Sequence, residues 1–396
     1  MAVMKSMRQS PTDPAFVQNP YAFYEEARPH GPLVWWKEYG MPAALSQDLV
    51  QALFKDRRFG REVPAELAQP HAAHLDPFYT IEAHSMLELE PPRHTRLRSL
   101  VLRAFTTRQI QAMRDDIHAL CHDLIDAFPK GPFDLIPAYA APLPVAIICR
   151  LLGFPEAMGE QLLLWSNDMV AMYQARRTRE IEDRAAQAST EFADFVRSYI
   201  DQRRANPSDD LLTQLIAAEE DGEKLSTDEL VTTCILLLNA GHEATVHSLG
   251  NGVKTLLEHQ TPIEAYAPDR IDRTVEEILR YDPPLHMFTR HAYEPVEIAG
   301  HQFKRGDQVA LLLGAANRDP LAYEDAQSFD TTRAPLKNAA FGGGLHFCVG
   351  APLARLELQI ALPILFERCP NLSLAEAPQY ANLYHFHGLD RLLVTS

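Results

Sequence analysis

The sequence predicts a mainly α-helical protein with small β-sheets, and three observations lead to this fold class. Residues 110–220 read as helical almost throughout, with only short breaks. Ser226 and Glu229 form a Ser-x-x-Glu capping box that opens a long helix, and its apolar run at residues 234–238 implies burial on all sides. Strand-like runs are short, at residues 33–36, 43–45, 296–298 and 308–312. With 46% hydrophobic residues the chain can bury a large core, and we expect a single domain over residues 1–396.

Composition excludes several classes of protein. The formal net charge of −16 argues against a nucleic-acid-binding protein and favours solubility. The five cysteines are scattered, odd in number and never in Cys-x-x-Cys pairs, so neither a disulfide framework nor a zinc site is expected. A reducing cytoplasm is therefore the expected location. Residues 1–19 contain no apolar signal region and no apolar span of about 20 residues, so we expect neither export nor a membrane anchor.

The first 90 residues combine short elements with a long irregular segment. Residues 1–19 are polar and interrupted by prolines, which indicates a loosely ordered lead-in. A short helix at residues 21–27, the two strands around the Tyr39-Gly40 turn, and an amphipathic helix at residues 47–54 follow. Residues 62–89 show no clean period and are rich in Ala, His and Pro, so they are predicted to be mostly loop. Long irregular segments in compact enzymes are often binding loops.

A helix is predicted to open after the double proline at residues 91–92. His94 and Arg98 lie four residues apart and share one face of this helix. Two cationic or donor groups on one face suit a pair of carboxylates, although a solvated basic face is the commoner outcome of such a pattern. Further on, Gly153 and Pro155 stop one helix, two long helices occupy residues 165–200, and residues 206–210 form a turn and a cap.

The long helix that begins after Ser226 carries a stretch of small side chains. Ala240, Gly241, Ala244, Thr245 and Ser248 fall on one face by the four-residue repeat, so something wide and flat could lie against them. Close packing against another helix is the alternative.

Glu243 lies within this stretch as an acid in the middle of a buried helix. Such an acid is costly unless it is paired or functional.

The second half of the chain contains a helix over residues 272–281 that Pro283 and Pro284 stop. Glu277 and Arg280 have helical spacing, which alone is a weak motif and usually marks a surface ion pair.

One cysteine then lies inside a glycine-rich loop, at residues 341–350, and a helix follows directly. The sulfur of Cys348 at the N-terminus of that helix faces free backbone N–H groups and the positive end of the helix dipole, which favour a thiolate. A buried structural cysteine in a turn is the alternative.

The run Phe-Gly-x-Gly-x-His-x-Cys-x-Gly followed by Leu353-Ala354-Arg355 resembles the heme-binding loop of the cytochrome P450 family. The resemblance extends from about residue 20 to the end of the chain. It implies a fold in which heme b lies between the long distal helix, at Ala240 and Gly241, and the helix that follows the cysteine loop. It further implies that the Cys348 thiolate holds the heme iron and that Phe341, Gly342 and Gly350 shape the loop. His94, Arg98, Arg290 and His346 match the residues that bind the heme propionates, and Glu277, Arg280 and Arg333 match a structural triad beneath the loop.

The resemblance also implies roles at the distal side. The family usually places an oxygen-activating Thr directly after the acid, but this chain has Ala244 there and Thr245 one residue later, about 100° around the helix. We therefore expect Glu243 and Thr245, an ordered water or a substrate hydroxyl to relay protons. Substrate contacts are expected at the side chains of Met86, Leu87, Leu285, Phe288 and Phe386.

The expected function is that of a heme-thiolate monooxygenase, which inserts one atom of O₂ into a small-to-medium, largely apolar organic substrate. No Gly-x-Gly-x-x-Gly follows a strand, so electrons are expected from a separate ferredoxin-type donor with its reductase. A monomer is expected, without nucleic-acid or membrane partners. Ala244 leaves open a peroxide-driven peroxygenase, and a heme-based ligand sensor or carrier is the alternative outside the enzymes.

Overall fold

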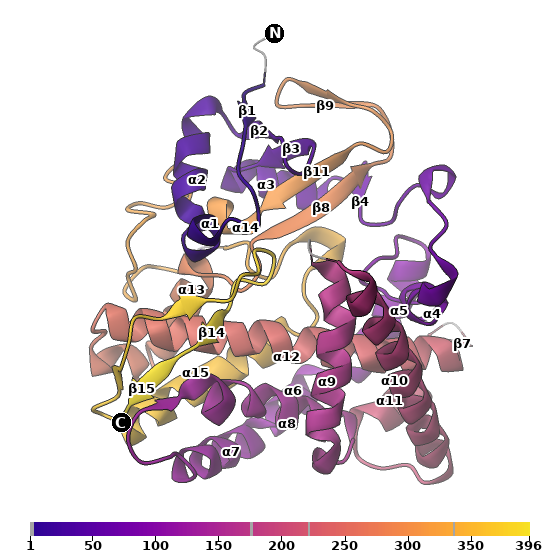
Figure 1. Cartoon of the computed structure of the whole chain (residues 1–396). Coiled ribbons are helices and arrows are strands. Elements are labelled where there is room, and N and C mark those ends of the chain that lie inside the picture. The colour runs from indigo at the N-terminus through magenta and orange to yellow at the C-terminus, as the bar shows by residue number, and fades with distance from the viewer. Residues whose placement is uncertain (1–3, 175–176, 221, 336) are drawn as a thin grey trace.

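The structure is a computed structural model that describes residues 4–174, 177–220, 222–335 and 337–396. Helices make up most of it and the sheets are small, which confirms the predicted fold class (Figure 1). The helices are α1 (Pro14–Gln18), α2 (Pro20–Ala27), α3 (Gln47–Lys55), α4 (Asp76–Glu82), α5 (Arg93–Ala104), α6 (Thr107–Ala112), α7 (Arg114–Asp126), α8 (Pro142–Leu152), α9 (Gly159–Val170), α10 (Arg179–Ala205), α11 (Leu211–Ala217), α12 (Thr227–Glu258), α13 (Ile271–Tyr281), α14 (Leu313–Asn317) and α15 (Ala351–Arg368).

Short strands fall into one larger sheet and several small ones. They are β1 (Ser6–Met7), β2 (Leu33–Trp36), β3 (Met41–Ala44), β4 (Phe59–Gly60), β5 (Phe133–Asp134), β6 (Glu219–Glu220), β7 (Glu223–Lys224), β8 (Met287–Ala292), β9 (Val296–Ile298), β10 (His301–Phe303), β11 (Gln308–Leu312), β12 (Ser373–Leu374), β13 (Gln379–Tyr380), β14 (Leu389–Arg391) and β15 (Leu393–Thr395). The larger sheet has the order β1-β2-β3-β11-β8-β4.

The larger sheet joins the two halves of the chain. Figure 1 shows its indigo N-terminal strands beside the orange strands β8 and β11. β11 is parallel to β3, with Ala310 opposite Ala43, and antiparallel to β8, with Val309 opposite Arg290. This register fixes the position of Arg290 within the sheet.

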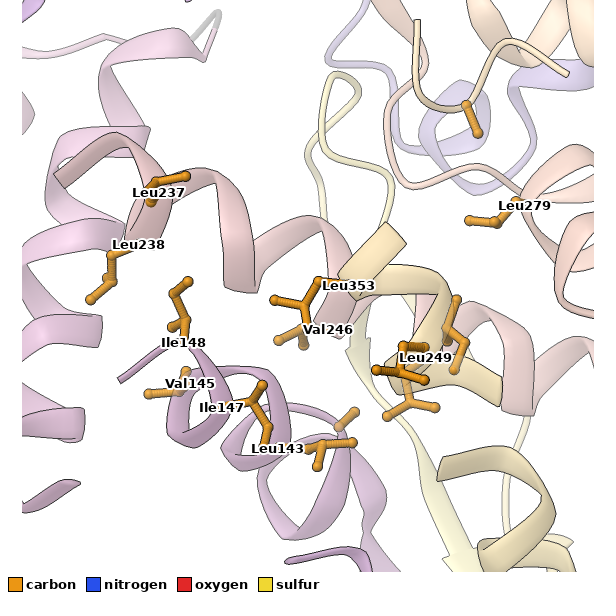
Figure 2. Packing of buried hydrophobic residues seen from close by; sticks show 14 of the residues in the cluster. Leu143, Val145, Ile147, Ile148, Leu237, Leu238, Val246, Leu249, Leu279 and Leu353 are labelled. Carbon is orange, nitrogen blue, oxygen red and sulfur yellow. The ribbon is translucent and has the colours of Figure 1, made fainter. Parts of the chain in front are cut away.

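Helix α12 is the longest helix and crosses the helical part of the molecule (Figure 1). The predicted capping box is confirmed, because the Ser226 hydroxyl accepts from the Glu229 N–H at 3.2 Å and the Glu229 carboxylate accepts from the Ser226 N–H at 2.9 Å. Figure 2 shows Ile148 of α8 and Leu353 of α15 close to Val246 of α12. Apolar packing around α12 therefore positions it between α8 and α15.

Two other predicted boundaries are confirmed. Gly153 ends α8 with φ of +77°, the left-handed conformation that suits a helix C-terminus. Asp210 caps α11, and its carboxylate accepts from the Thr213 N–H at 2.8 Å. None of the helices in the described part of the chain has both the length and the apolar character to cross a membrane.

The N-terminal segment differs from the prediction. Residues 4–19 are not a loosely ordered lead-in, because β1 pairs with β2 and α1 buries Phe16 and Val17. The Phe16 ring packs edge-to-face against Trp36, with ring centroids 5.9 Å apart. Such short elements gain their order from tertiary contacts, which local sequence patterns do not contain. Residues 62–89 are mostly loop, which confirms the prediction, and α4 forms within them over the buried side chains of Phe78 and Ile81.

A buried ion-pair network lies beneath the cysteine loop. Glu277 accepts two hydrogen bonds from Arg280, both 2.7 Å long, and Arg333 lies 3.3 Å from the same carboxylate. The predicted triad contact is thus confirmed, but Glu277 and Arg280 are buried rather than at the surface. Next to it, Glu276 of α13 accepts from Arg355 of α15 at 2.5 Å. These contacts tie the helix that follows Cys348 to α13.

We expect Glu277→Gln to lower the free energy of unfolding by about 3–5 kcal/mol, because it leaves two guanidinium groups without a buried anion. Urea unfolding followed by circular dichroism measures this change. The control is Glu264→Gln, at an exposed position where we expect a change within about 0.5 kcal/mol. A Glu277→Gln protein as stable as the control would show that the network contributes little.

Candidate active site

The middle of α12 is open where most of the helix is buried. Ala240 is exposed, and Gly241 and Ala244 are partly exposed, whereas Leu238 and Leu249 on either side are buried. An exposed alanine inside such a helix marks a surface on which no described side chain packs. A wide, flat group could therefore lie against this stretch.

The predicted single face of small residues divides in two. Gly241 packs against Ile148 of α8, since a Cβ added at this glycine would lie 3.5 Å from the Ile148 side chain. Thr245 and Ser248 are buried, and the Thr245 hydroxyl donates to the Gly241 carbonyl oxygen at 3.2 Å. Close helix packing thus applies to one side of the stretch, and the two alanines carry the open side.

The cysteine loop folds through glycines with left-handed backbone. Gly342 and Gly344 have φ of +68° and +65°, a region that favours glycine. At Gly344 an added Cβ would also lie 1.9 Å from the backbone oxygen of Phe54, so a larger residue would displace the loop. The Cys348 N–H donates to the Phe341 carbonyl oxygen at 3.1 Å and closes the loop.

Cys348 stands at the beginning of α15, which Gly350 precedes and Pro352 opens. Burial, the largest effect, raises the pKa of the Cys348 thiol. The backbone N–H groups of Gly350 and Ala351 and the guanidinium of Arg98 act in the opposite direction without cancelling it. A coordinated metal ion deprotonates such a thiol outright. The site therefore suits a metal thiolate better than a free nucleophile.

Imidazole and cationic side chains meet beside this loop. The rings of His94 of α5 and His346 lie 4.4 Å apart between centroids, and Arg98 donates to the Phe347 carbonyl oxygen at 2.6 Å. His94 is 1% exposed, and its Nδ1 has no hydrogen-bond partner among the described residues. Burial lowers the pKa of His94 to about 4, so the ring is neutral and can donate one N–H.

Arg290 of β8 is a buried cation with no ion-pair partner among the described residues. It donates to the Thr289 carbonyl oxygen at 2.8 Å, and its guanidinium lies 5.3 Å from the centre of the Phe54 ring. Burial lowers the pKa of Arg290 to about 10. A buried guanidinium is costly unless an anion pairs with it, so this position fits a carboxylate of a bound group.

Glu90 is a residue of this site that the sequence interpretation missed. Its carboxylate pairs with His346 Nε2 at 2.9 Å and accepts from the Arg61 N–H at 2.7 Å. Burial works against ionisation of Glu90, but these two hydrogen bonds leave its pKa lowered. No local pattern could have identified it, because Glu90 precedes α5 and its partner His346 lies 256 residues further along the chain.

Glu243 is partly buried, with 16% of its side chain exposed, rather than fully buried as expected. Its Oε2 has no hydrogen-bond partner among the described residues, and its Oε1 lies 3.9 Å from His247 Nε2. His247, one helical turn further along, is the second residue that sequence reasoning did not single out. The acid thus stands beside the open stretch of α12 with room for an additional hydrogen bond.

The predicted substrate contacts separate into two groups. Leu285 and Phe386 form an isolated β-bridge, and Met86 is buried while Leu87 is partly exposed in the segment before α5. The Phe288 ring packs against Phe54 at 6.3 Å between centroids, and a Cβ added at Gly342 of the cysteine loop would lie 3.4 Å from it. Phe288 is partly buried, as Leu285 is, and its role as a substrate contact stays a prediction.

The residues present fit a heme. The two alanines offer a flat surface, Cys348 offers a sulfur ligand at the start of α15, and the orphaned His94 nitrogen and the buried Arg290 suit two propionates. A thiolate-ligated heme supplies the cleavage of the O–O bond of O₂. The protein supplies the ligand, the donors that hold the carboxylates, and an acid at Glu243.

Comparison with known proteins agrees with this fit. A sequence profile described as "Cytochrome P450" matches residues 154–266 and 271–377. The polyketide biosynthesis cytochrome P450 PksS of Bacillus subtilis is 37% identical over 99% of both chains. The cytochrome P450 monooxygenase PikC of Streptomyces venezuelae is 36% identical over 92% of this chain and 87% of its own. The crystal structure of P450BioI in complex with hexadec-9Z-enoic acid ligated acyl carrier protein superposes with a TM-score of 0.90 and 34% identity, and covers 96% of this chain and 99% of that one.

These findings confirm the resemblance drawn from the cysteine loop and the distal helix. The protein uses an organic substrate, O₂ and a redox partner that delivers electrons. The chain belongs to the cytochrome P450 family and is a heme-thiolate monooxygenase that binds heme b.

Proposed function

We propose that Cys348 is the thiolate ligand of the heme iron and that residues 1–396 form one domain around the heme. The observation that carries this proposal is the half-buried sulfur at the start of α15, toward which the Gly350 and Ala351 N–H groups point. Phe341, Gly342 and Gly350 shape the loop, and Ala240 lies on the open stretch of α12.

His94, Arg98, Arg290 and His346 hold the two propionates in this proposal. The orphaned Nδ1 of His94 and the buried guanidinium of Arg290 support it most directly. His346 already pairs with Glu90, so its part is to orient the neighbouring donors as well as to donate. Arg98 reaches the same region from one turn along α5.

Glu243 and Thr245 deliver protons in this proposal, and Ala244 replaces the usual hydroxyl. The free Oε2 of Glu243 supports its part, since a general acid needs a route to the reacting oxygen. The Thr245 hydroxyl already donates its hydrogen to the Gly241 carbonyl oxygen. Its oxygen can still accept a hydrogen bond, so Thr245 takes part by accepting one from a water or a substrate hydroxyl.

The substrate class is a small-to-medium, largely apolar organic molecule bound near Met86, Leu87, Leu285, Phe288 and Phe386. Two relatives support an acyl or polyketide chain, since one is a polyketide biosynthesis cytochrome P450 and one structure carries a fatty acid on an acyl carrier protein. The electron donor is a ferredoxin with its reductase, and the exposed Leu345 and Phe347 beside Cys348 offer it an apolar contact. The protein acts as a cytoplasmic monomer in this proposal, without nucleic-acid or membrane partners.

We expect Cys348→Ser to abolish the red-shifted Soret band of the ferrous–carbon monoxide complex, because that band requires a thiolate ligand. The measurement is an absorption spectrum of the reduced protein under carbon monoxide, after expression with heme precursor. Cys369→Ser, which removes a buried cysteine away from the loop, keeps the band. A wild-type protein that binds heme without the band would overturn the assignment of Cys348.

We expect Glu243→Gln to lower the rate of product formation about 100-fold, because it removes a general acid from the distal side. Ala244→Thr changes the ratio of product to reductant consumed, since it places a hydroxyl beside that acid, and Thr245→Ala lowers the same ratio. Reductant consumption and product are measured together. If Ala244→Thr and Thr245→Ala both leave the ratio unchanged, the proton relay through these residues fails.

The next prediction distinguishes O₂ with a redox partner from hydrogen peroxide as the oxidant. We expect substrates from a panel of free fatty acids, acyl carrier protein conjugates and macrolactones to be oxidised with ferredoxin, its reductase and NAD(P)H. Hydrogen peroxide alone is expected to support less product. Faster turnover with peroxide would instead identify a peroxygenase, and heme binding without turnover by either route would identify a sensor or carrier.

A further inference from the structure

Several buried polar atoms without a hydrogen-bond partner among the described residues lie along one side of α12. They begin at Glu243 Oε2 beside the open stretch and continue with His247 Nε2 and Asn251 Oδ1, each one turn further along. Both ring nitrogens of His387 belong to the same set, and the Asn251 side chain donates to the His387 carbonyl oxygen at 2.8 Å. Buried polar atoms in native proteins are nearly always satisfied by protein or ordered water, so this grouping needs an occupant.

The row continues to the surface beyond His387. Asp282 Oδ1 lies 3.5 Å from His387 Nε2, and Asp282 Oδ2 lies 3.9 Å from the Lys254 ammonium. Lys254 in turn pairs with Glu258 at 3.1 Å, and the Glu258 side chain is 37% exposed. We call these residues the polar column: Glu243, His247, Asn251, His387, Asp282, Lys254 and Glu258.

Three separations in the polar column are slightly longer than a hydrogen bond. They are 3.9 Å between Glu243 and His247, 3.5 Å between Asp282 and His387, and 3.9 Å between Lys254 and Asp282. Each gap is too long for a strong direct hydrogen bond, and a water beside such a pair can accept from one group and donate to the other.

Gly388 allows the His247 side chain of the polar column to lie directly against the C-terminal loop. A Cβ added there would lie 1.8 Å from His247 Nδ1, so only glycine lets this ring lie against the loop that carries His387.

Charge within the column favours water over a metal ion. Asp282, His286 and His387 are buried with ligand atoms within 4.8 Å of one another, the arrangement of a possible metal site. However, Asp282 already accepts from the hydroxyls of Tyr21, at 2.9 Å, and Tyr380, and Lys254 stands beside it. A divalent cation would add charge next to an ammonium in a buried region, which is costly.

From this geometry we infer that ordered waters complete the polar column into a proton path that runs from Glu258 at the surface, through Lys254, to Glu243. The inference rests on the proposed role of Glu243 as the proton donor. In each step one N–H or O–H bond breaks as another forms on the next group, and no electron moves. Reduction of O₂ with insertion of one oxygen atom takes up two electrons and two protons, and the second oxygen atom leaves as water. The column resupplies Glu243 with these protons.

The burial of His387 suits it to pass on a proton within the polar column. Burial, the largest effect, lowers the pKa of His387 to about 4, so the ring rests neutral. A neutral imidazole accepts a proton on one nitrogen and releases one from the other. His247 lies between the C-terminal loop and Glu243, where its imidazole can pass on a proton in the same way.

The test uses the heme-loaded full chain with His247→Leu and Lys254→Met, and Thr255→Val as the matched control. Thr255 is buried on the same helix with an unpartnered hydroxyl, but it lies outside the polar column. We expect both column variants to keep the ferrous–carbon monoxide band and the substrate-induced spectral shift. We expect them to lower product per reductant about tenfold and to raise the solvent isotope effect. A high-resolution crystal structure is expected to show waters that bridge His247 to Glu243 and Asp282 to His387.

Other outcomes overturn the inference. Normal coupling in His247→Leu and Lys254→Met, while Glu243→Gln is impaired, removes the path but leaves the proposed function intact. A silent Glu243→Gln with a normal carbon monoxide band removes the role of Glu243 itself. A metal ion at Asp282, His286 and His387, detected by anomalous scattering and elemental analysis, replaces the waters and ends the proton path. If His247→Leu does not fold, His247→Asn tests the same step with a smaller polar group.

Discussion

The structure centres on the sulfur of Cys348, which lies half-buried at the start of α15. Removal from water raises the pKa of this thiol, and the N–H groups at the start of α15 only partly oppose this effect. A bound metal ion would supply the counter-charge that favours the thiolate. The glycines of the loop, the proline in the first turn of α15 and the Glu276–Arg355 pair all help to hold this one atom in place.

The donors beside that sulfur come from distant parts of the chain. Arg290 is fixed by the register of β8 against β11, and His94 by α5, although the two residues lie almost 200 positions apart in the sequence. The buried Glu277 network carries its own anion, so it is complete within the protein. Arg290 is also buried, but it has no ion-pair partner among the described residues. This contrast separates the structural cations of the Glu277 network from the cation that we assign to a bound carboxylate.

Helix α12 has two functions along its length. Its apolar residues pack against α8 and α15, which sets the distance between the open alanines and the cysteine loop (Figure 2). Its polar residues, spaced by one turn, lead from Glu243 to Glu258 along the C-terminal loop.

A feature of the fold was predictable from the sequence when the residues that determine it are neighbours in the chain. The helix boundaries at Ser226, Gly153 and Asp210 were predictable because caps and glycine C-termini act within one turn. The lead-in was mispredicted because β1 and α1 are ordered by contacts with β2 and Trp36. The position of Phe288 follows from the pairing of β8, which no pattern within the segment reveals.

The sequence by itself determined the class of protein, since the cysteine loop is a continuous motif whose glycines, histidine and sulfur act within ten residues. The tertiary structure alone decided which small residues of α12 are open, that Glu90 pairs with His346, and that His247 stands between Glu243 and the C-terminal loop. The physical reason is the separation along the chain over which each interaction acts. Helix dipoles, caps and backbone conformation act between neighbours in the chain, whereas burial and the partners of buried charges arise only when distant segments meet.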